Sequence, residues 1–78
     1  MIYEKAVTFI SEQFNIDESE VGEDMSFEDI GADEFDIAEL VSALEGEFEI
    51  ELSEDEIADI KDVRGLVKLI KTAVELSN

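Results

Sequence analysis

The chain has 78 residues and a formal net charge of −18, from 23 acidic and five basic side chains, and it contains neither cysteine nor histidine. This length predicts a single domain over residues 1–78, and the missing thiols and imidazoles exclude disulfides, cysteine or histidine metal ligands and the usual nucleophile–histidine catalysis. We therefore expect a protein that is not an enzyme and that binds neither nucleic acid nor an anionic membrane surface, because both would repel it.

The sequence shows no signal for secretion or membrane insertion. The N-terminal stretch MIYEKAVTF lacks the charged region and apolar block of a secretory signal, and no apolar run in the chain is long enough to cross a bilayer. We therefore expect a cytoplasmic protein without membrane insertion.

The first predicted helix spans about residues 2–14. Its apolar side chains recur at steps of three or four and predict one buried stripe: Tyr3, Ala6, Val7, Ile10 and Phe14.

A long polar loop is predicted over residues 15–33. Asn15 marks the end of the first helix, and a short turn is expected at about residues 17–20. The loop is too long to be a simple turn, so we expect it to lie on the core. Its apolar side chains are spaced as anchors for that contact: Ile16, Val21, Met25, Phe27 and Ile30.

The second helix is predicted from about Glu34 to Phe48. Asp33 as N-cap and Asp36 three residues later resemble a capping box, in which each side chain accepts a hydrogen bond from the backbone of the other. The spacing of the apolar residues again predicts one buried stripe: Ile37, Leu40, Val41, Leu44 and Phe48.

Two further helices complete the predicted fold. Ser53 and Glu56 match a second capping box, for a short helix through about Ile60. Asp62 is expected to cap a last helix over about residues 63–76. The inward side chains of that helix are predicted to be Leu66, Val67, Ile70 and Val74, with Arg64, Lys68 and Lys71 on another face.

The predicted fold class is all-α. Alternation in FEIEL could suggest a strand, but five residues with no partner elsewhere in the sequence cannot build a sheet. We expect a small four-helix bundle with three principal helices, one short helix and a long first loop.

The charges are segregated along the chain. Between Ala6 and Ile60 there is no lysine or arginine, whereas that stretch holds 20 of the 23 acidic residues. A basic protein surface is the natural complement. The carboxylates of residues 28–36 are dense but do not follow the spacing of a calcium-binding loop, so we expect only weak, adventitious divalent-ion binding and no specific metal site.

Four ordered segments resemble the acyl carrier proteins of fatty-acid and polyketide synthesis. They are SFEDIGAD, DIAELVSALEGEFEIEL, SEDEIADI and DVRGLVKLIK, and they span most of the chain. The resemblance implies a four-helix fold whose second helix docks onto basic patches of partner enzymes. It also implies a 4'-phosphopantetheine arm, attached to a serine in an Asp-Ser-Leu motif at the start of that helix.

Asp33, Glu34 and Phe35 stand where the resemblance places this motif, so the serine is replaced by glutamate. Attachment needs a hydroxyl oxygen that attacks the pyrophosphate of coenzyme A, and a carboxylate gives at best a labile acyl phosphate. Ser26 lies in the preceding loop and Ser42 two turns into the helix, so neither has the context of the motif. We therefore expect no phosphopantetheine cofactor.

Two interpretations apply to each of the two replaced positions. Glu34 stabilises the positive end of the helix dipole by roughly 0.3 to 1 kcal/mol, and it could also mimic the negative charge of the phosphodiester in an armed carrier. Phe35 either covers the core from above or takes part in partner contact.

We interpret the chain as an acidic protein-docking module with a regulator, decoy or assembly role. Its expected partners are acyl-transfer or synthase enzymes with basic patches, and the chain itself is expected to be a monomer. Glu39, Glu45 and Glu47 are predicted to project opposite the buried stripe of their helix. The predicted docking surface is Asp33, Glu34, Phe35, Asp36, Glu39, Glu45, Glu47, Glu51 and Asp55.

In the family, an apolar cavity between the second and third helices can shelter an acyl chain. We expect a filled core instead, since a chain without the arm has no acyl group to shelter. The candidate lining residues are Ala38, Leu44, Phe48, Ile57 and Ala58.

Three alternatives remain open at this point. The chain could be a carrier, natural or engineered, whose attachment serine was replaced by glutamate. It could carry acyl groups by other chemistry, or it could be a small structural protein of unrelated function.

Overall fold

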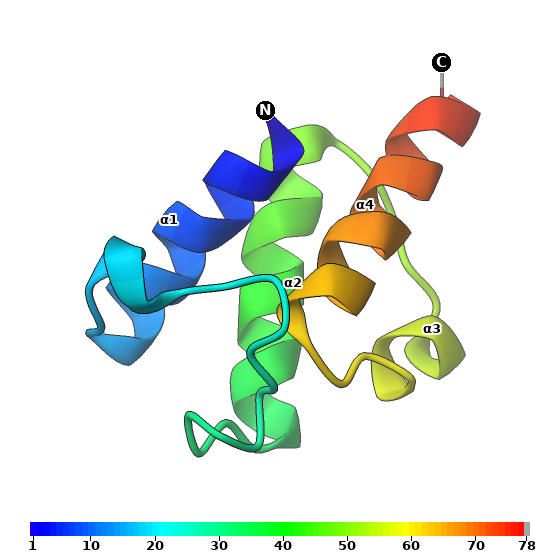
Figure 1. Ribbon diagram of the computed structural model, residues 1–78. Helices are drawn as coiled ribbons and strands as arrows, with labels where there is room; N and C mark the ends of the chain where they lie inside the picture. Colours follow the sequence, from blue (N-terminus) through cyan, green and yellow to red (C-terminus); the bar gives the residue numbers. More distant parts are fainter. Residues whose placement is uncertain (78) are drawn as a thin grey trace.

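The computed structural model describes residues 1–77, and these residues form an all-α fold (Figure 1). Within this range no strand is present, and a single isolated antiparallel bridge joins Ser26 to Asp62. The predicted fold class is therefore confirmed. The elements, in chain order, are α1 (Ile2–Phe14), the 3-10 turn η1 (Glu18–Glu20), α2 (Glu34–Phe48), α3 (Glu54–Ala58) and α4 (Val63–Ser77).

The predicted boundaries of α1 and α2 agree with the structure, and α4 extends one residue further than predicted. The predicted end of the short helix at Ile60 is wrong, because α3 ends at Ala58. The backbone N–H groups of Asp59 and Ile60 donate to carbonyl oxygens three residues back, which tightens the last turn and ends the helix. This turn brings the Ile60 side chain into the core.

Three of the helices start with a side-chain cap, as the sequence predicts. Asp33 and Asp36 form a complete capping box on α2, and Ser53 and Glu56 form one on α3. Before α4, the Asp62 Oδ1 accepts a hydrogen bond from the Gly65 N–H at 2.8 Å. These caps satisfy backbone donors that have no partner inside the helix.

The hydrophobic core lies between α1, α2 and α4, with the first loop across one side of it (Figure 1). The central side chain of each predicted stripe is fully buried: Ile10 in α1, Leu40 and Leu44 in α2, and Leu66 and Ile70 in α4. The end members of the stripes, such as Tyr3 and Phe48, are half-buried. Burial of these apolar side chains is the main favourable term in folding.

The long first loop is packed on the bundle. Of its predicted anchors, Val21 and Phe27 are buried, and Phe27 is only 2% exposed. Three backbone hydrogen bonds of 2.9–3.0 Å also tie the loop to the start of α4. They run from the N–H of Phe27 to Lys61, from that of Val63 to Met25 and from that of Arg64 to Glu23. The loop therefore closes one side of the core.

Within residues 1–77, no helix is both long enough and apolar enough to cross a membrane.

Candidate functional site

The start of α2 is built by a tight turn and the capping box. Gly31 has a φ of +71°, a conformation that glycine adopts without strain, and it turns the chain into the helix. Asp33 Oδ1 then accepts the Asp36 N–H at 2.9 Å, and Asp36 Oδ2 accepts the Asp33 N–H at 3.2 Å. The two aspartates are thereby engaged with the backbone, and Glu34 becomes the first helical residue.

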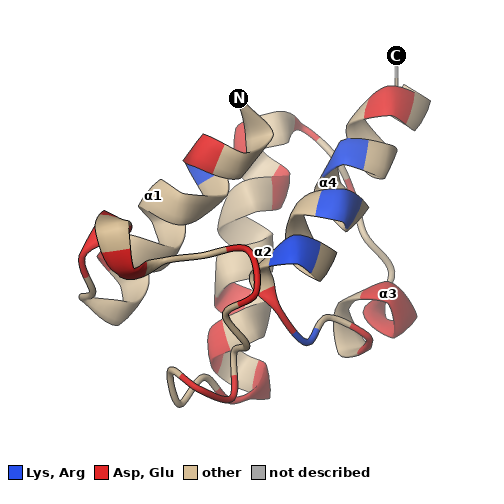
Figure 2. Cartoon of the chain, viewed as in Figure 1, with Lys and Arg blue, Asp and Glu red and all other residues tan. Residues whose placement is uncertain are grey.

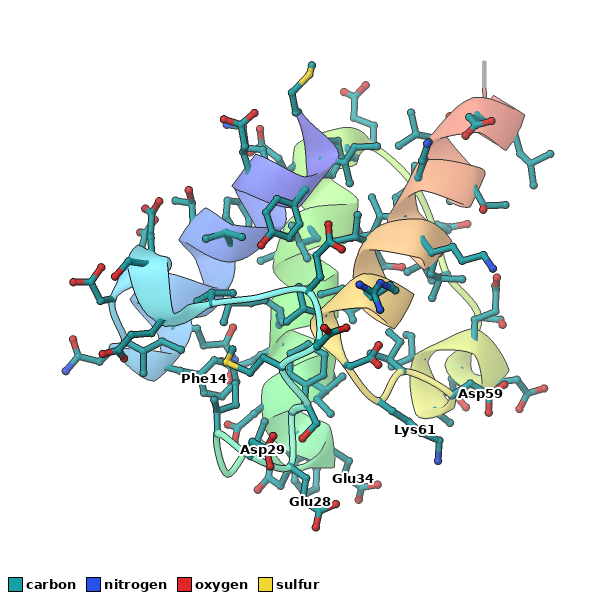
Figure 3. All side chains as sticks on the ribbon, in the orientation of Figure 1. Phe14, Glu28, Asp29, Glu34, Asp59 and Lys61 are labelled. Carbon is teal, nitrogen blue, oxygen red and sulfur yellow. The ribbon has the colours of Figure 1, made fainter. Side chains whose placement is uncertain are left out.

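The Glu34 side chain is exposed at this helix start. In Figure 3 its carboxylate lies at the lower end of α2 and points away from the bundle, as does that of Glu28. A negative charge at this position interacts favourably with the helix dipole. Position 34 therefore presents a charged oxygen acceptor to solvent and offers no hydroxyl group.

The two serines nearest in sequence lie elsewhere. Ser26 Oγ accepts a hydrogen bond of 3.1 Å from the Asp29 N–H within the first loop. Ser42 is exposed on α2, eight residues and so about two turns beyond Glu34. Among residues 1–77 there is also no group of three or more acidic side chains placed to hold a metal ion.

Phe35 is 74% exposed. The expectation that its ring covers the core from above is therefore wrong. It occupies the second position of α2, and the helical rotation from the buried Leu40 and Leu44 places it on the outward side. An exposed aromatic ring next to Glu34 is available for contact with another molecule.

An open groove lies between α2 and α3, beside Phe35. It has a volume of about 500 Å³. Its lining is mostly apolar with two carboxylates: Glu34, Phe35, Ile37, Ala38, Glu54, Ile57, Ala58 and Ile60.

The groove agrees in part with the predicted lining of an apolar cavity. Ala38, Ile57 and Ala58 line it as expected, whereas Leu44 is fully buried in the core and Phe48 is half-buried further along α2. The expected filled core is present around Leu44. Between α2 and α3, however, the space is an open surface groove.

The acidic residues of α2 do not all project from one side, contrary to the expectation from the sequence. Glu39 is exposed, but Glu45 is half-buried and its Oε2 accepts the Leu52 N–H at 2.8 Å. Glu47 Oε2 lies 3.3 Å from the Lys5 Nζ of α1. Glu45 therefore supports the α2–α3 connection, and Glu47 links two helices of the bundle.

The remaining predicted docking residues lie after α2. Glu51 is exposed in the connection to α3, and Asp55 is exposed on α3 itself. The capping box of α3 also affects a carboxylate nearby, because the hydrogen bonds from the backbone N–H and the side chain of Ser53 lower the pKa of Glu56. Acidic side chains are therefore exposed both at the start of α2 and on α3.

The basic side chains lie mainly on α4 (Figure 2). Arg64 forms ion pairs of 3.0 Å with Glu23 and 2.6 Å with Asp24, and the hydrogen bond to Glu23, with the charge of Asp24, raises the pKa of Arg64. Lys68 and Lys71 are exposed on the same helix. The segregation of charge seen in the sequence is thus kept in space.

Comparison with known proteins identifies the family. The model described as "Phosphopantetheine attachment site" matches residues 4–70. The chain belongs to the acyl carrier protein family. An acyl carrier protein of Clostridium acetobutylicum is 41% identical over 76 residues, which cover 96% of this chain and 99% of that protein. An acyl carrier protein of Guillardia theta is 42% identical over 74 residues, covering 94% of this chain and 91% of that protein.

Solved structures of acyl carrier proteins share the fold. That of an acyl carrier protein from Thermotoga maritima has a TM-score of 0.86 at 28% identity, covering 100% of this chain and 96% of that one. The hexanoyl form of the acyl carrier protein of the actinorhodin polyketide synthase of Streptomyces coelicolor has a TM-score of 0.77 at 26% identity, covering 99% of this chain and 90% of that one. The four-helix family fold is therefore shown, and acyl carrier proteins are carriers rather than enzymes.

The sequence did not predict three residues of the site. Ile37, Glu54 and Ile60 line the groove but were not among the predicted docking or cavity residues. Glu54 directly follows the cap Ser53, so its place at the start of α3 corresponds to that of Glu34 at the start of α2. That parallel was the available signal in the sequence.

Proposed function

We propose that this member of the acyl carrier protein family acts as a protein-docking module and does not carry an acyl group on a phosphopantetheine arm. The observation that carries the proposal is the exposed Glu34 at the first position of α2, where the family resemblance places the attachment serine. An acceptor carboxylate at that position cannot form the phosphodiester of the arm.

The residues around the start of α2 do not fit phosphopantetheine attachment. Ser26 Oγ already accepts a hydrogen bond within the first loop, and Ser42 lies in the body of α2. Neither serine follows an N-cap aspartate at a helix start. Without a hydroxyl in that context we expect the arm, and the thiol it would supply, to be absent.

The partners we propose are acyl-transfer or synthase enzymes with basic surface patches. The supporting feature is the acidic surface from the start of α2 to α3, in a chain of net charge −18. Opposite charges accelerate association and select the partner more than they raise affinity. We propose that the chain docks as a monomer and acts as a regulator, a decoy or an assembly component.

The charge of Glu34 has a proposed role in this docking. A phosphodiester at the start of α2 carries one negative charge, and Glu34 places one there permanently. We expect Glu34→Gln to weaken binding to an enzyme that recognises armed carriers, with Glu75→Gln on α4 as the control for overall charge. If the Glu34→Gln variant binds such an enzyme as well as the original chain does, the mimicry is excluded.

The loading experiment tests the proposal directly. The protein is incubated with a phosphopantetheinyl transferase and coenzyme A, and its intact mass is measured. We expect no mass increase for the original chain and the mass of one phosphopantetheine on the Glu34→Ser variant. A covalently bound pantetheine on any serine of the original chain would overturn the proposal and restore a carrier function.

Salt dependence tests the docking itself. Binding of a purified acyl-carrier-dependent enzyme should weaken strongly between 0.01 M and 0.15 M ionic strength, since the Debye length falls from about 30 Å to about 8 Å. Failure to bind any such enzyme would favour the alternative of a structural protein. Equal binding at both ionic strengths would contradict electrostatic docking.

A further inference from the structure

The α2–α3 groove combines three features, of which the docking proposal uses only the carboxylate of Glu34. Its lining consists of aliphatic side chains, which we call the floor, the carboxylates of Glu34 and Glu54, which we call the rim, and the exposed ring of Phe35, which we call the aromatic edge. We propose that the groove receives one long cationic side chain, arginine or lysine, from a basic partner protein. This inference rests on the proposed docking function and specifies which partner group the groove binds.

The floor of the groove includes two small residues. Ala38 on α2 and Ala58 on α3 are both exposed, and Ile37 and Ile57 also line the groove. Its volume of about 500 Å³ lies within the ~300–1,000 Å³ of typical ligand sites. Lysine and arginine bury their aliphatic stems on such apolar surfaces while the charged end stays in water.

The rim selects the sign of the occupant. Glu34 and Glu54 are the first residues of α2 and α3, and both line the groove. In the part of the chain that the structure describes, neither lies within ion-pair distance of a basic side chain. Both carboxylates attract a cationic head group at the rim, whereas both repel a carboxylate head group there.

The Phe35 ring adds a preference for a guanidinium or ammonium group. Its side chain is 74% exposed and lines the groove next to Glu34. Cations bind to aromatic faces within about 6 Å of the ring centre. The apolar floor, the acidic rim and the aromatic edge together match a lysine or arginine side chain better than a neutral or anionic alkyl chain.

The test uses small probes, so that it does not depend on a partner protein. The ¹⁵N-labelled protein is titrated with n-octylammonium, octanoate or octanol below their aggregation concentrations, and amide chemical shifts are followed. We expect octylammonium to shift the resonances of Ala38, Ile57 and Ala58. Octanoate at the same concentration should leave these resonances unchanged, and octanol should shift them less than octylammonium does.

Matched variants separate the groove from the general acidity of the chain. The double change Glu34→Gln and Glu54→Gln should weaken octylammonium binding roughly fivefold, at about 0.5 kcal/mol for each exposed charge. Glu75→Gln, near the far end of α4, should leave it unchanged. Ala38→Leu or Ala58→Leu, each at an exposed position, should fill the groove and abolish the shifts while circular dichroism stays native.

The outcomes that overturn the inference are distinct from those that overturn the docking function. Equal binding of octanoate, or octylammonium shifts that persist in both leucine variants, would exclude a cationic site in the groove. If octylammonium binds as expected but no acyl-carrier-dependent enzyme does, the groove is retained and the proposed function fails. If an enzyme binds equally to the original chain and to the leucine variants, docking is retained and the groove does not receive a partner side chain.

Discussion

The two sides of α2 differ in how they are covered. On one side α1, α4 and the first loop close the core, with Phe27 only 2% exposed and three backbone hydrogen bonds from the loop to the start of α4. On the other side α3 is a helix of five residues without a buried side chain, and Phe35 is 74% exposed beside an open groove. We therefore assign stability and binding to opposite sides of one helix.

The two phenylalanines provide the strongest test of this comparison. Phe27→Ala should lower the free energy of unfolding by about 3–5 kcal/mol, because it leaves a cavity in the closed side of the core. Phe35→Ala should change it by less than about 0.5 kcal/mol, since the ring is exposed. Urea unfolding followed by circular dichroism measures both values. Similar losses for the two variants would contradict the assignment of the two sides.

The ionic strength should affect the stability of the whole fold, because the 23 acidic side chains greatly outnumber the five basic ones. Repulsion among like charges destabilises the compact state and is screened by salt. Raising NaCl from 0.01 M to 0.5 M should raise the melting temperature by at least about 5 °C, which corresponds to roughly 1 kcal/mol for a domain of this size. A melting temperature that is independent of salt would show that the charges are already balanced by local contacts.

A substitution at the end of α2, where the connection to α3 begins, should stabilise the fold. Glu49 has a φ of +56°, a left-handed conformation that favours glycine. Glu49→Gly should raise the free energy of unfolding by about 1 kcal/mol, measured by urea denaturation. Glu49→Gln is the control, because it removes the charge and keeps the strained backbone. If the glutamine variant gains as much, charge rather than conformation is the cause.

The smallest global effect is expected for the cap of α3. Ser53→Ala removes one half of the capping box, and the hydrogen exchange of α3 should accelerate while the free energy of global unfolding falls by less than about 0.5 kcal/mol. Global destabilisation of the size expected for Phe27→Ala would show that α3 is part of the cooperative core.

The same cap predicts a pH dependence of α3. The backbone N–H of Ser53 donates a hydrogen bond to the Glu56 carboxylate and lowers the pKa of Glu56 in the folded state. The stability that this hydrogen bond gives to α3 is therefore fully present above the ordinary glutamate pKa. It is lost as the pH falls through the lowered value. Acidification should therefore open α3 locally, while the rest of the fold gains from reduced repulsion, and amide hydrogen exchange can distinguish these two responses.

Local sequence signals were sufficient for the starts of the helices and for their caps, although not for the end of α3. The start and end of α2, the capping boxes at Asp33 and Ser53, and the cap Asp62 all depend on side chains within a few residues of the backbone groups that they contact. The buried stripes likewise follow from the period of the helix. These features are therefore readable from neighbouring residues alone.

Only the tertiary structure decided which outward residues are free. Periodicity indicates the side of a helix that faces the core, but it does not show whether another element reaches the opposite side. Glu47 is paired because α1 brings Lys5 to it, and Glu45 is engaged because the chain returns at Leu52. Phe35 stays exposed because no described element covers this outward position of α2, and an open groove between α2 and α3 lies beside it.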